Sequence, residues 1–185
     1  MTEFVYQLKL PPITDMLLDG IVDHVLTSSD EFKYKSVLAK SIIKPECLNI
    51  NGFTFHEALL FYKTNGSLGR IHRDTVDPSK TIWGINWVYG GFGTLEYWDE
   101  SDLISEDVNE RIDEQGYPIV HYKSLVPARK KYMMSSPNAY LVNATQIHRP
   151  VGWGSRWAIS LRTGTGNISW EDLVERFKDL IVCQN

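Results

Sequence analysis

The sequence predicts a mainly β protein with flanking helices, built as a sandwich or a barrel. From Phe53 onward, short segments rich in aromatic and β-branched residues recur, and each is bounded by Gly, Asn, Asp or Pro. Regular helical segments do not alternate with these strands, as they would in a parallel α/β fold. The clearest helical patterns lie near the two ends of the chain.

The composition is that of one globular domain spanning residues 1–185. Hydrophobic residues make up 43% of the chain and aromatic residues 12%, enough to bury a substantial core. The formal net charge of −4 argues against a general attraction to nucleic acid or anionic membranes. The chain carries no signal-peptide pattern and no apolar stretch near the ~20 residues that span a bilayer. We expect a cytoplasmic protein with no membrane association, acting on a small-molecule or peptidyl substrate.

Two elements are expected before the β-rich region. Residues 1–12 alternate between apolar and polar side chains and end in two prolines, which predicts an edge strand. Apolar residues then recur at helical spacing, which predicts a helix over residues 13–27. Residues 31–51 carry mixed signals, and no element is assigned there.

The β-rich region contains a series of expected strands that place the β core at about residues 53–163. They are Phe53–Lys63, Gly69–Asp74, Thr81–Tyr89, Gly93–Trp98, Tyr117–Val126, Lys131–Ser135, Ala139–Asn143, Ile147–Val151 and Arg156–Thr163. Many short strands separated by turn signals favour a sandwich or a barrel.

Two further segments flank or interrupt this series. Residues 99–116 are acidic and polar, which is typical of a solvated surface insertion, here with some helix. Residues 169–182 predict an amphipathic helix with Ser169 as its N-cap. Its apolar face comprises Trp170, Leu173, Phe177 and Leu180.

The run His72-Arg73-Asp74 supplies two side chains of the metal-ligand type. On a strand, residues two apart project from the same face, so His72 and Asp74 can bind one ion. His148 lies 76 positions later and is a third candidate. Two histidines and one carboxylate make the facial triad that holds non-haem Fe(II) and leaves coordination positions open.

The last strand carries two cations on one face. Gly152-Trp153-Gly154 is expected to form the turn of an antiparallel hairpin that leads into this strand. Alternation then places Arg156 and Arg162 on one face, together with small residues, and large apolar side chains on the other. A guanidinium buried among small residues needs an anion, and a bound dicarboxylate would supply one.

With these residues in place, the sequence resembles the Fe(II)/2-oxoglutarate-dependent oxygenases, in their prolyl-hydroxylase-like branch. The resemblance covers residues 59–163 with a gap at 99–130, in four blocks that follow the family's order. The blocks are Tyr62-x-x-x-Gly66 with His72-x-Asp74, the run GGFGTLEY from Gly90 to Tyr97, Asn143 to His148, and Arg156 with its strand. It implies the double-stranded β-helix fold, also called jelly-roll or cupin-like, with the terminal helices packed on one sheet.

The resemblance also implies the activity and the metal ligands. His72, Asp74 and His148 would bind Fe(II), and the enzyme would couple decarboxylation of 2-oxoglutarate to O2-dependent oxidation of a substrate C–H bond. Related halogenases lack the carboxylate ligand, so Asp74 favours a hydroxylase. No catalytic residue beyond the metal ligands is implied.

For the co-substrate, the resemblance assigns four residues. Arg156 would pair with the far carboxylate of 2-oxoglutarate, and Tyr62 would donate a hydrogen bond to the same group. Arg156 follows His148 by eight residues, slightly fewer than is usual in the family, so Arg162 is a competitor for this role. Asn86, on the strand Thr81–Tyr89, is a further candidate.

Two other functions stay open at this point. A cupin-type metalloenzyme that does not use 2-oxoglutarate would have the same fold, although cupins typically carry H-x-H and a later Glu. A non-catalytic jelly-roll binding module is the other. His56 and His121 lie on expected strands without a carboxylate at H-x-D spacing, and we interpret both as structural. The substrate, the oligomeric state and the role of the insertion within residues 99–130 are not determined by the sequence.

Overall fold

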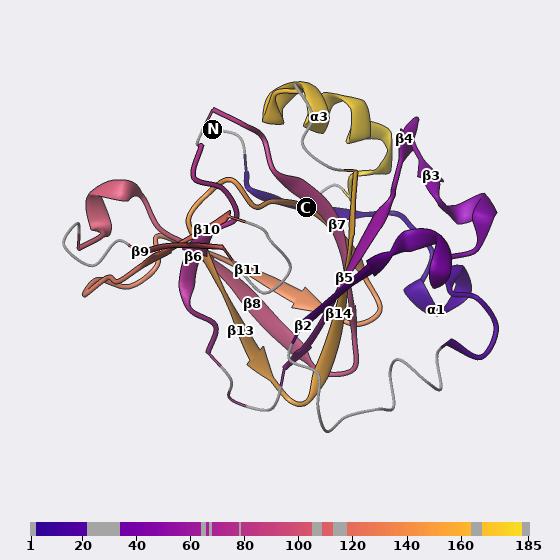
Figure 1. Cartoon of the computed structure of the whole chain (residues 1–185), viewed down its shortest axis with the longest axis horizontal. Coiled ribbons are helices and arrows are strands. Elements are labelled where there is room, and N and C mark those ends of the chain that lie inside the picture. The colour runs from indigo at the N-terminus through magenta and orange to yellow at the C-terminus, as the bar shows by residue number, and fades with distance from the viewer. Residues whose placement is uncertain are drawn as a thin grey trace.

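The computed structural model describes residues 3–21, 34–63, 66, 68–77, 79–104, 109–112, 118–163 and 168–182. Within these ranges the chain forms two six-stranded sheets that pack face to face, with one small hairpin beside them (Figure 1). All the strand pairs in both sheets are antiparallel. No helix in this part of the chain is long and apolar enough to cross a membrane.

The first sheet has the strand order β1-β12-β7-β14-β5-β2. Its strands are β1 (Val5–Leu8), β12 (Ala139–Asn143), β7 (Trp83–Tyr89), β14 (Arg156–Arg162), β5 (Glu57–Lys63) and β2 (Tyr34–Leu38). The sheet thus recruits strands from outside the expected β core of residues 53–163. The predicted N-terminal edge strand is confirmed as β1, whereas β2 lies where the sequence suggested no element.

The second sheet has the strand order β11-β8-β13-β6-β10-β9. Its strands are β11 (Lys130–Ser135), β8 (Phe92–Tyr97), β13 (His148–Trp153), β6 (Ile71–Arg73), β10 (Pro118–Tyr122) and β9 (Asn109–Ile112). Each expected strand segment overlaps an observed strand. The acidic segment 99–116 differs from the expectation, because it supplies the strand β9 after a short 3-10 turn, Glu100–Asp102.

Consecutive strands cross from one sheet to the other, which is the double-stranded β-helix, or jelly-roll, topology. The chain passes between the sheets from β7 to β8, from β11 to β12, from β12 to β13 and from β13 to β14. The expected hairpin around Gly154 is therefore wrong, since β13 and β14 lie in opposite sheets. Gly154 has φ +73°, a conformation that glycine adopts without strain, and this lets the chain turn sharply between the layers.

The N-terminal helix is much shorter than predicted. The helix α1 spans Ile13–Met16 only, and the next residue, Leu17, is extended and forms a β-bridge with Ile43. Ile13, Leu17 and Ile43 are all buried, so their helix-like spacing reflects packing of an irregular segment. Residues 22–27 of the predicted helix lie outside the described residues.

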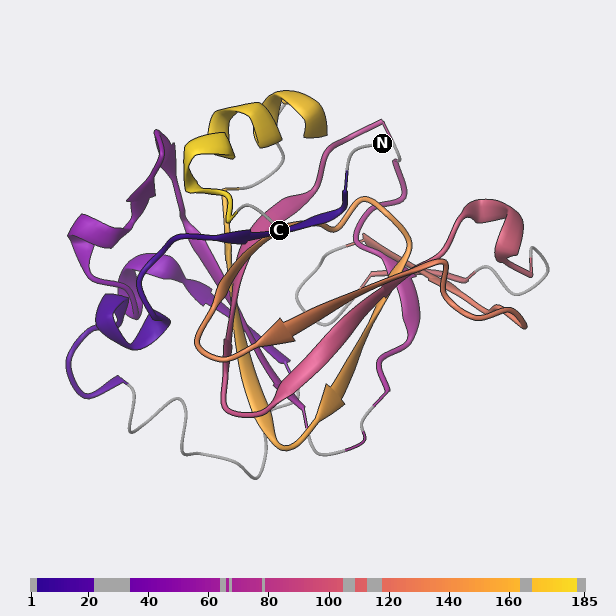
Figure 2. The same ribbon diagram turned by 180° about the vertical axis from the view of Figure 1, so that it is seen from behind.

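The C-terminal helix is confirmed and packs on the outer face of the first sheet (Figures 1 and 2). It is α3 (Trp170–Phe177), followed by a 3-10 turn, Lys178–Leu180. The Ser169 hydroxyl accepts a hydrogen bond from the Asp172 backbone N–H at 3.1 Å, which caps the helix N-terminus. Val182 then donates its N–H to the Gln7 carbonyl at 2.9 Å, so the C-terminal segment runs beside β1.

Among the described residues, three hydrophobic clusters result from this arrangement, and the smallest comprises Ile71, Trp98 and Ile147. The two others lie on the two faces of the first sheet. The larger core lies between the outer face of the first sheet, α3 and the N-terminal segments, and it includes Trp83, Trp157 and Phe177. The smaller core lies between the two sheets and comprises Val5, Val88, Leu95, Tyr97, Met134, Tyr140 and Val142. Its members come from β1, β7 and β12 on one side and from β8 and β11 on the other. The apolar cluster between the sheets therefore lies in the half formed by β1, β12, β7, β8 and β11.

The small hairpin stands apart from the two main sheets. It joins β3 (Asn49–Ile50) to β4 (Phe53–Thr54) through Asn51 and Gly52. Both turn residues have positive φ, 53° and 81°, as tight hairpin turns require. Two 3-10 turns, Ala39–Ser41 and Pro45–Cys47, connect β2 to this hairpin.

Candidate metal centre and anion site

Two neighbouring strands bring the three predicted metal ligands together. His72 is the central residue of β6, Asp74 follows the end of that strand, and His148 is the first residue of β13. His72 and His148 are direct cross-strand partners, so their side chains project from the same face. The loop before β13 also holds Asp74, because the Asp74 N–H donates to the Ala144 carbonyl at 3.2 Å.

The geometry of these three residues suits one metal ion. One potential ligand atom from each residue lies within 4.8 Å of the other two. The Nε2 atom of His72 is 3.3 Å from Oδ1 of Asp74, and the two imidazole rings have centroids 4.4 Å apart. Two imidazoles and one carboxylate, facing inward from one sheet, form the donor set expected for Fe(II) in a facial triad.

Backbone carbonyls orient both imidazoles. In His72 and in His148, Nδ1 lies 2.8 Å from a carbonyl oxygen two residues earlier, that of Arg70 and of Gln146 respectively. A carbonyl can only accept, so each Nδ1 carries a proton. Each Nε2 then faces the shared site, where a bound metal ion would take the lone pair that a proton can otherwise occupy, as on His72 beside Asp74. This is the outer-shell pattern that fixes the tautomer and direction of metal-binding histidines.

The protonation states of Asp74 and His148 favour binding of a metal cation. Burial opposes ionisation of Asp74, but the hydrogen bond to His72, together with the charges of His72, His148 and Arg162, lowers its pKa below the ordinary range. Burial, followed by repulsion from His72, lowers the pKa of His148 to about 4. Near neutral pH the site therefore presents an ionised carboxylate and a neutral His148, both of which are the ligating forms.

The lowered pKa of His148 predicts a particular pH dependence. In the metal-free protein, the His148 imidazole should titrate with a midpoint at about 4, followed through its ring carbon and proton signals by NMR. The unfolded chain takes up this proton near pH 6.5, so the free energy of unfolding should fall as the pH drops from about 6.5 to about 4, by at most ~1.4 kcal/mol per pH unit. A midpoint near 6.5 in the folded protein would contradict the buried environment.

Arg162 lies against the metal ligands. Its Nη2 is 3.4 Å from Oδ2 of Asp74, and its Nε donates to the Ser160 hydroxyl at 2.9 Å. Gly84 makes room for this side chain, because a Cβ at that position would lie 2.8 Å from Nε of Arg162. Arg162 is thus a neighbour of the triad that can orient the second oxygen of Asp74.

Arg156 lies at the other end of β14 and is unsatisfied. The side chain is buried at 5% exposure, and its Nη2 makes one long hydrogen bond to the Val151 carbonyl at 3.4 Å. Its Nε and Nη1 have no hydrogen-bond partner among the described residues, and burial lowers its pKa. A buried cation with unused donors marks an anion-binding position, because leaving it unpaired is costly.

Gly93 forms part of the cradle around Arg156. A Cβ at Gly93 would lie 2.5 Å from both Cζ and Nη1 of Arg156, so only glycine leaves space for the guanidinium there. Asn86 points into the same inter-sheet space, since it pairs with Ser160, on the arginine-bearing face of β14. Its Oδ1 is buried and lacks a hydrogen-bond partner in the described part of the chain. Asn86 is therefore available to a ligand between the sheets.

Tyr62 is not brought to the site. It pairs with Trp157, and its ring packs on that indole at a centroid distance of 5.1 Å. Trp157 belongs to the core on the outer face of the sheet, whereas Arg156 projects from the inner face. The predicted hydrogen bond from Tyr62 to a co-substrate bound at Arg156 is contradicted by this strand parity.

The two histidines that were expected to be structural have different surroundings. His56 is exposed and lies outside the ligand cluster. His121 is the direct partner of His72 across the β10–β6 pair, so its side chain lies beside the metal ligands on the same face. The sequence could not reveal this neighbour, because it contains no signal for the pairing of β10 with β6.

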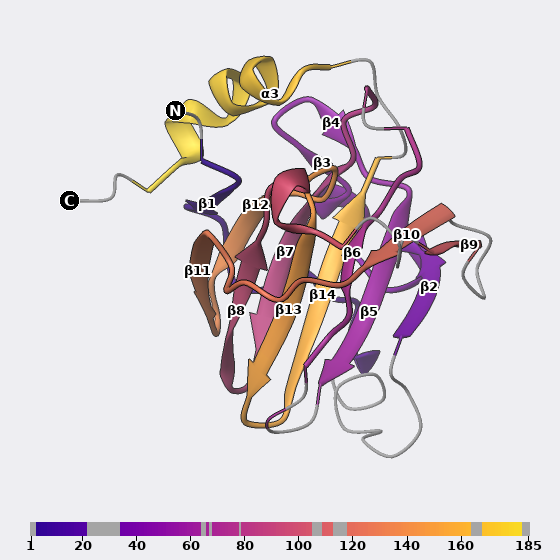
Figure 3. The ribbon, with the colours of Figure 1, turned by 90° about the vertical axis from the view of Figure 1, so that its left-hand side faces the viewer.

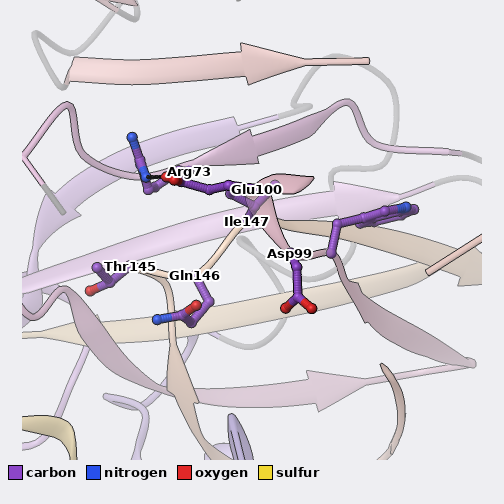
Figure 4. A pocket seen from close by; sticks show the side chains of 7 residues that line it. Arg73, Asp99, Glu100, Thr145, Gln146 and Ile147 are labelled. Carbon is purple, nitrogen blue, oxygen red and sulfur yellow. Dashed lines mark hydrogen bonds and ion pairs between the residues drawn. The ribbon is translucent and has the colours of Figure 1, made fainter. Parts of the chain in front are cut away.

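A polar pocket lies on the outer face of the second sheet (Figure 4). It has a volume of about 210 Å³ and is lined by Arg73, Trp98, Asp99, Glu100, Thr145, Gln146 and Ile147. Arg73 alternates with His72 on β6 and points away from the triad; it pairs with Glu100 at 2.8 Å. The pocket is therefore separated from the inward-facing ligand atoms by β6.

The chain has structural likenesses of low sequence identity. No protein-family model matches the sequence, and a search of curated proteins finds no match. A cupin 2 domain-containing protein from Halorhodospira halophila is similar at 10% identity with a TM-score of 0.39, covering 96% of this chain and 90% of that chain. The coconut allergen cocosin is similar at 10% identity with a TM-score of 0.38; the match covers 82% of this chain and 36% of cocosin.

These likenesses concern the course of the chain and do not bear on chemistry. The assignment of a jelly-roll rests on the strand order and crossings of the chain itself. The strand order and crossings define a cupin-like jelly-roll fold. The inward-facing cluster of His72, Asp74 and His148 gives this fold a candidate metal centre.

Proposed function

We propose that this protein is an Fe(II)- and 2-oxoglutarate-dependent dioxygenase, most simply a hydroxylase. The observation that supports it is the combination of two features in one inter-sheet space. One is the His72, Asp74 and His148 cluster, and the other is the buried guanidinium of Arg156 with unused donors. A metal site alone would not require a second, anion-binding position in the interior.

In this proposal the three ligands hold the metal, and their surroundings keep them in the ligating form. The carbonyls of Arg70 and Gln146 fix the imidazole tautomers, and Arg162 orients Asp74 through Oδ2. Bound Fe(II), 2-oxoglutarate and O2 would supply the oxidising power for substrate C–H hydroxylation, with succinate and CO2 as co-products. The protein itself contributes binding, orientation and shielding from water.

Arg156, and not Arg162, is the proposed anchor for the far carboxylate of 2-oxoglutarate. The two arginines are six residues apart on an extended strand, roughly 20 Å along β14. Arg162 already contacts Asp74 and Ser160. In Arg156, by contrast, Nε and Nη1 have no acceptor among the described residues. The Arg156 guanidinium reaches across to the second sheet, where it lies against Gly93 and the Val151 carbonyl, on the strand of His148 and its neighbour. A dicarboxylate that binds the metal with one end could therefore pair its other end with Arg156. Asn86 could add a hydrogen bond along that path.

A second candidate is a cupin-type metalloenzyme that does not use 2-oxoglutarate. The specific observation in its favour is that the triad, its carbonyl partners and the Arg162–Asp74 contact are complete without Arg156. Arg156 would then bind a different anion. A non-catalytic jelly-roll binding module is the remaining alternative.

Anaerobic titration of the protein with Fe(II) and 2-oxoglutarate tests the proposal. We expect a weak visible metal-to-ligand charge-transfer band that requires both additions, and succinate release when O2 is admitted with a substrate. Metal binding without a 2-oxoglutarate-dependent band would favour the cupin-type metalloenzyme. Absence of any metal binding would leave the binding module.

A further inference from the structure

The connecting segment, residues 144–147, joins β12 of the first sheet to β13 of the second. Figure 3 shows these two strands in different layers, so the segment crosses from one sheet to the other. The strand β13 begins with the metal ligand His148, directly after the segment. The conformation of the connecting segment therefore determines where this ligand enters the second sheet.

Two backbone carbonyls of the connecting segment hold metal ligands. The Nδ1 of His148 donates to the Gln146 carbonyl at 2.8 Å, and the Asp74 N–H donates to the Ala144 carbonyl at 3.2 Å. One short stretch of chain thus orients two ligands that belong to different strands. A displacement of this segment would change the directions of the His148 imidazole and the Asp74 carboxylate together.

Thr145 lies between these two carbonyls and ties the segment to the chain that leads into β7. Its hydroxyl accepts a hydrogen bond from the Ile82 N–H at 2.6 Å and donates to the Lys80 carbonyl at 3.0 Å. The residue is 8% exposed, so both bonds act in a low-dielectric environment, where they are stronger than in water. In the part of the chain that the structure describes, no other side chain of the segment makes a hydrogen bond.

Tyr97 supports the same stretch of chain from the second sheet. Its buried hydroxyl donates to the carbonyl of Asn143, the residue before the segment, at 3.1 Å. The side-chain oxygen of Asn143 in turn accepts the Thr145 N–H at 3.1 Å. Tyr97 is also the direct cross-strand partner of His148, with ring centroids 5.8 Å apart. Thr145 and Tyr97 therefore hold the segment from two sides, through the chain entering β7 and through β8.

We propose that Thr145 and Tyr97 are positioning residues of the metal centre, which act on His148 and Asp74 through the connecting segment. Both hydroxyls are engaged with backbone groups, so their role is indirect. The inference rests on the metal centre of the proposed function and is independent of 2-oxoglutarate. Buried networks of satisfied hydrogen bonds rigidify their surroundings, and a metal site needs ligand atoms that such surroundings hold in place.

Titration with Co(II) measures this without catalysis, because the visible bands of bound Co(II) depend on the arrangement of its ligands. The wild type, Thr145→Val and Thr145→Ser are compared at a temperature well below the melting temperature of each protein. We expect Thr145→Val to weaken Co(II) binding by about 10-fold, the lower end of the effect of an outer-shell partner, and to shift the visible bands at saturation. Thr145→Ser keeps the hydroxyl and should restore both the affinity and the spectrum.

Tyr97→Phe is the second variant. It keeps the ring beside His148 and removes the hydroxyl, so we expect a smaller loss of affinity with a spectral change of the same kind. If Thr145→Val does not fold, this variant decides the proposal.

Ser124→Ala is the matched control. Its hydroxyl donates to the Asp102 carbonyl at 2.8 Å, outside the connecting segment, so this variant should keep the Co(II) affinity and spectrum even where its melting temperature falls. A wild-type affinity and spectrum in both Thr145→Val and Tyr97→Phe overturns the inference, as does a loss in Thr145→Val that Thr145→Ser fails to restore. These results leave the proposed function standing.

The wild type separates the two failures. Co(II) binding without the charge-transfer band of Fe(II) and 2-oxoglutarate would remove the 2-oxoglutarate assignment, and the effects of Thr145→Val and Tyr97→Phe would still support the positioning roles. Failure of the wild type to bind Co(II) would remove both the inference and the proposed function.

Discussion

Replacing His72, Asp74 or His148 by alanine is expected to lower metal affinity by at least about 100-fold, since losing an outer-shell partner alone costs about 10- to 100-fold. The three ligand atoms lie within 4.8 Å of one another, and two remaining side chains cannot reproduce a facial triad. Iron-dependent turnover of 2-oxoglutarate should fall to background in each variant. Calorimetric titration with Mn(II) measures the first effect, and succinate release measures the second.

His56 supplies the matched control for these substitutions. It is an exposed histidine outside the ligand cluster, so His56→Ala should keep both metal affinity and turnover. The melting temperature of each variant separates loss of a ligand from loss of the fold. Unchanged turnover in any one of the three ligand variants would remove that residue from the triad.

The second large effect concerns the two arginines of β14. Arg156→Met should weaken 2-oxoglutarate binding by about 30-fold or more, because truncating one partner of a buried charge pair costs about 2–5 kcal/mol. Metal affinity should stay the same, since Arg156 contacts none of the ligands. The metal-free variant should be no less stable than the wild type, because the substitution removes a buried cation whose Nε and Nη1 have no partner among the described residues.

Arg162→Met should give the converse pattern. This substitution removes the partner of Asp74 Oδ2, so we expect metal affinity to fall by about 10-fold and the 2-oxoglutarate requirement to rise far less than in Arg156→Met. Calorimetric titrations of both variants with Mn(II), and then with 2-oxoglutarate, give the comparison. The reverse ranking for 2-oxoglutarate would move the anchor to Arg162.

Strand periodicity allowed much of the fold, and the shared face of His72 and Asp74, to be predicted. Alternation on β14 separated Arg156 and Arg162 from Trp157, Ile159 and Leu161, and the three apolar residues do pack in the core under α3. The two-residue spacing of His72 and Asp74 survives in the structure because local strand geometry determines which side chains share a face. Ser169 caps its helix for an equally local reason.

The errors arise where tertiary packing overrides a local pattern. Leu17 fits a helical spacing, yet its backbone is extended and forms a β-bridge with Ile43. Burial, and not a helix, therefore explains why an apolar residue stands at this position. Gly154 suggested a hairpin within one sheet. A tight turn can also join strands of two different sheets, and the partners of each strand decide which of the two occurs. Tyr62 had the right residue type for the site, and only its pairing with Trp157 reveals that it faces away.

The pairing of β1 with β12 and the contact of α3 with the first sheet join the two ends of the chain. The strands that carry the metal ligands, β6 and β13, are likewise distant in sequence and meet only through such long-range pairings. Proteins dominated by non-local strand pairing fold slowly, because loop closure must precede the stabilising contacts. During synthesis, the candidate metal centre can thus assemble only after β13 has been made, so metal capture would depend on the pairing of β6 with β13.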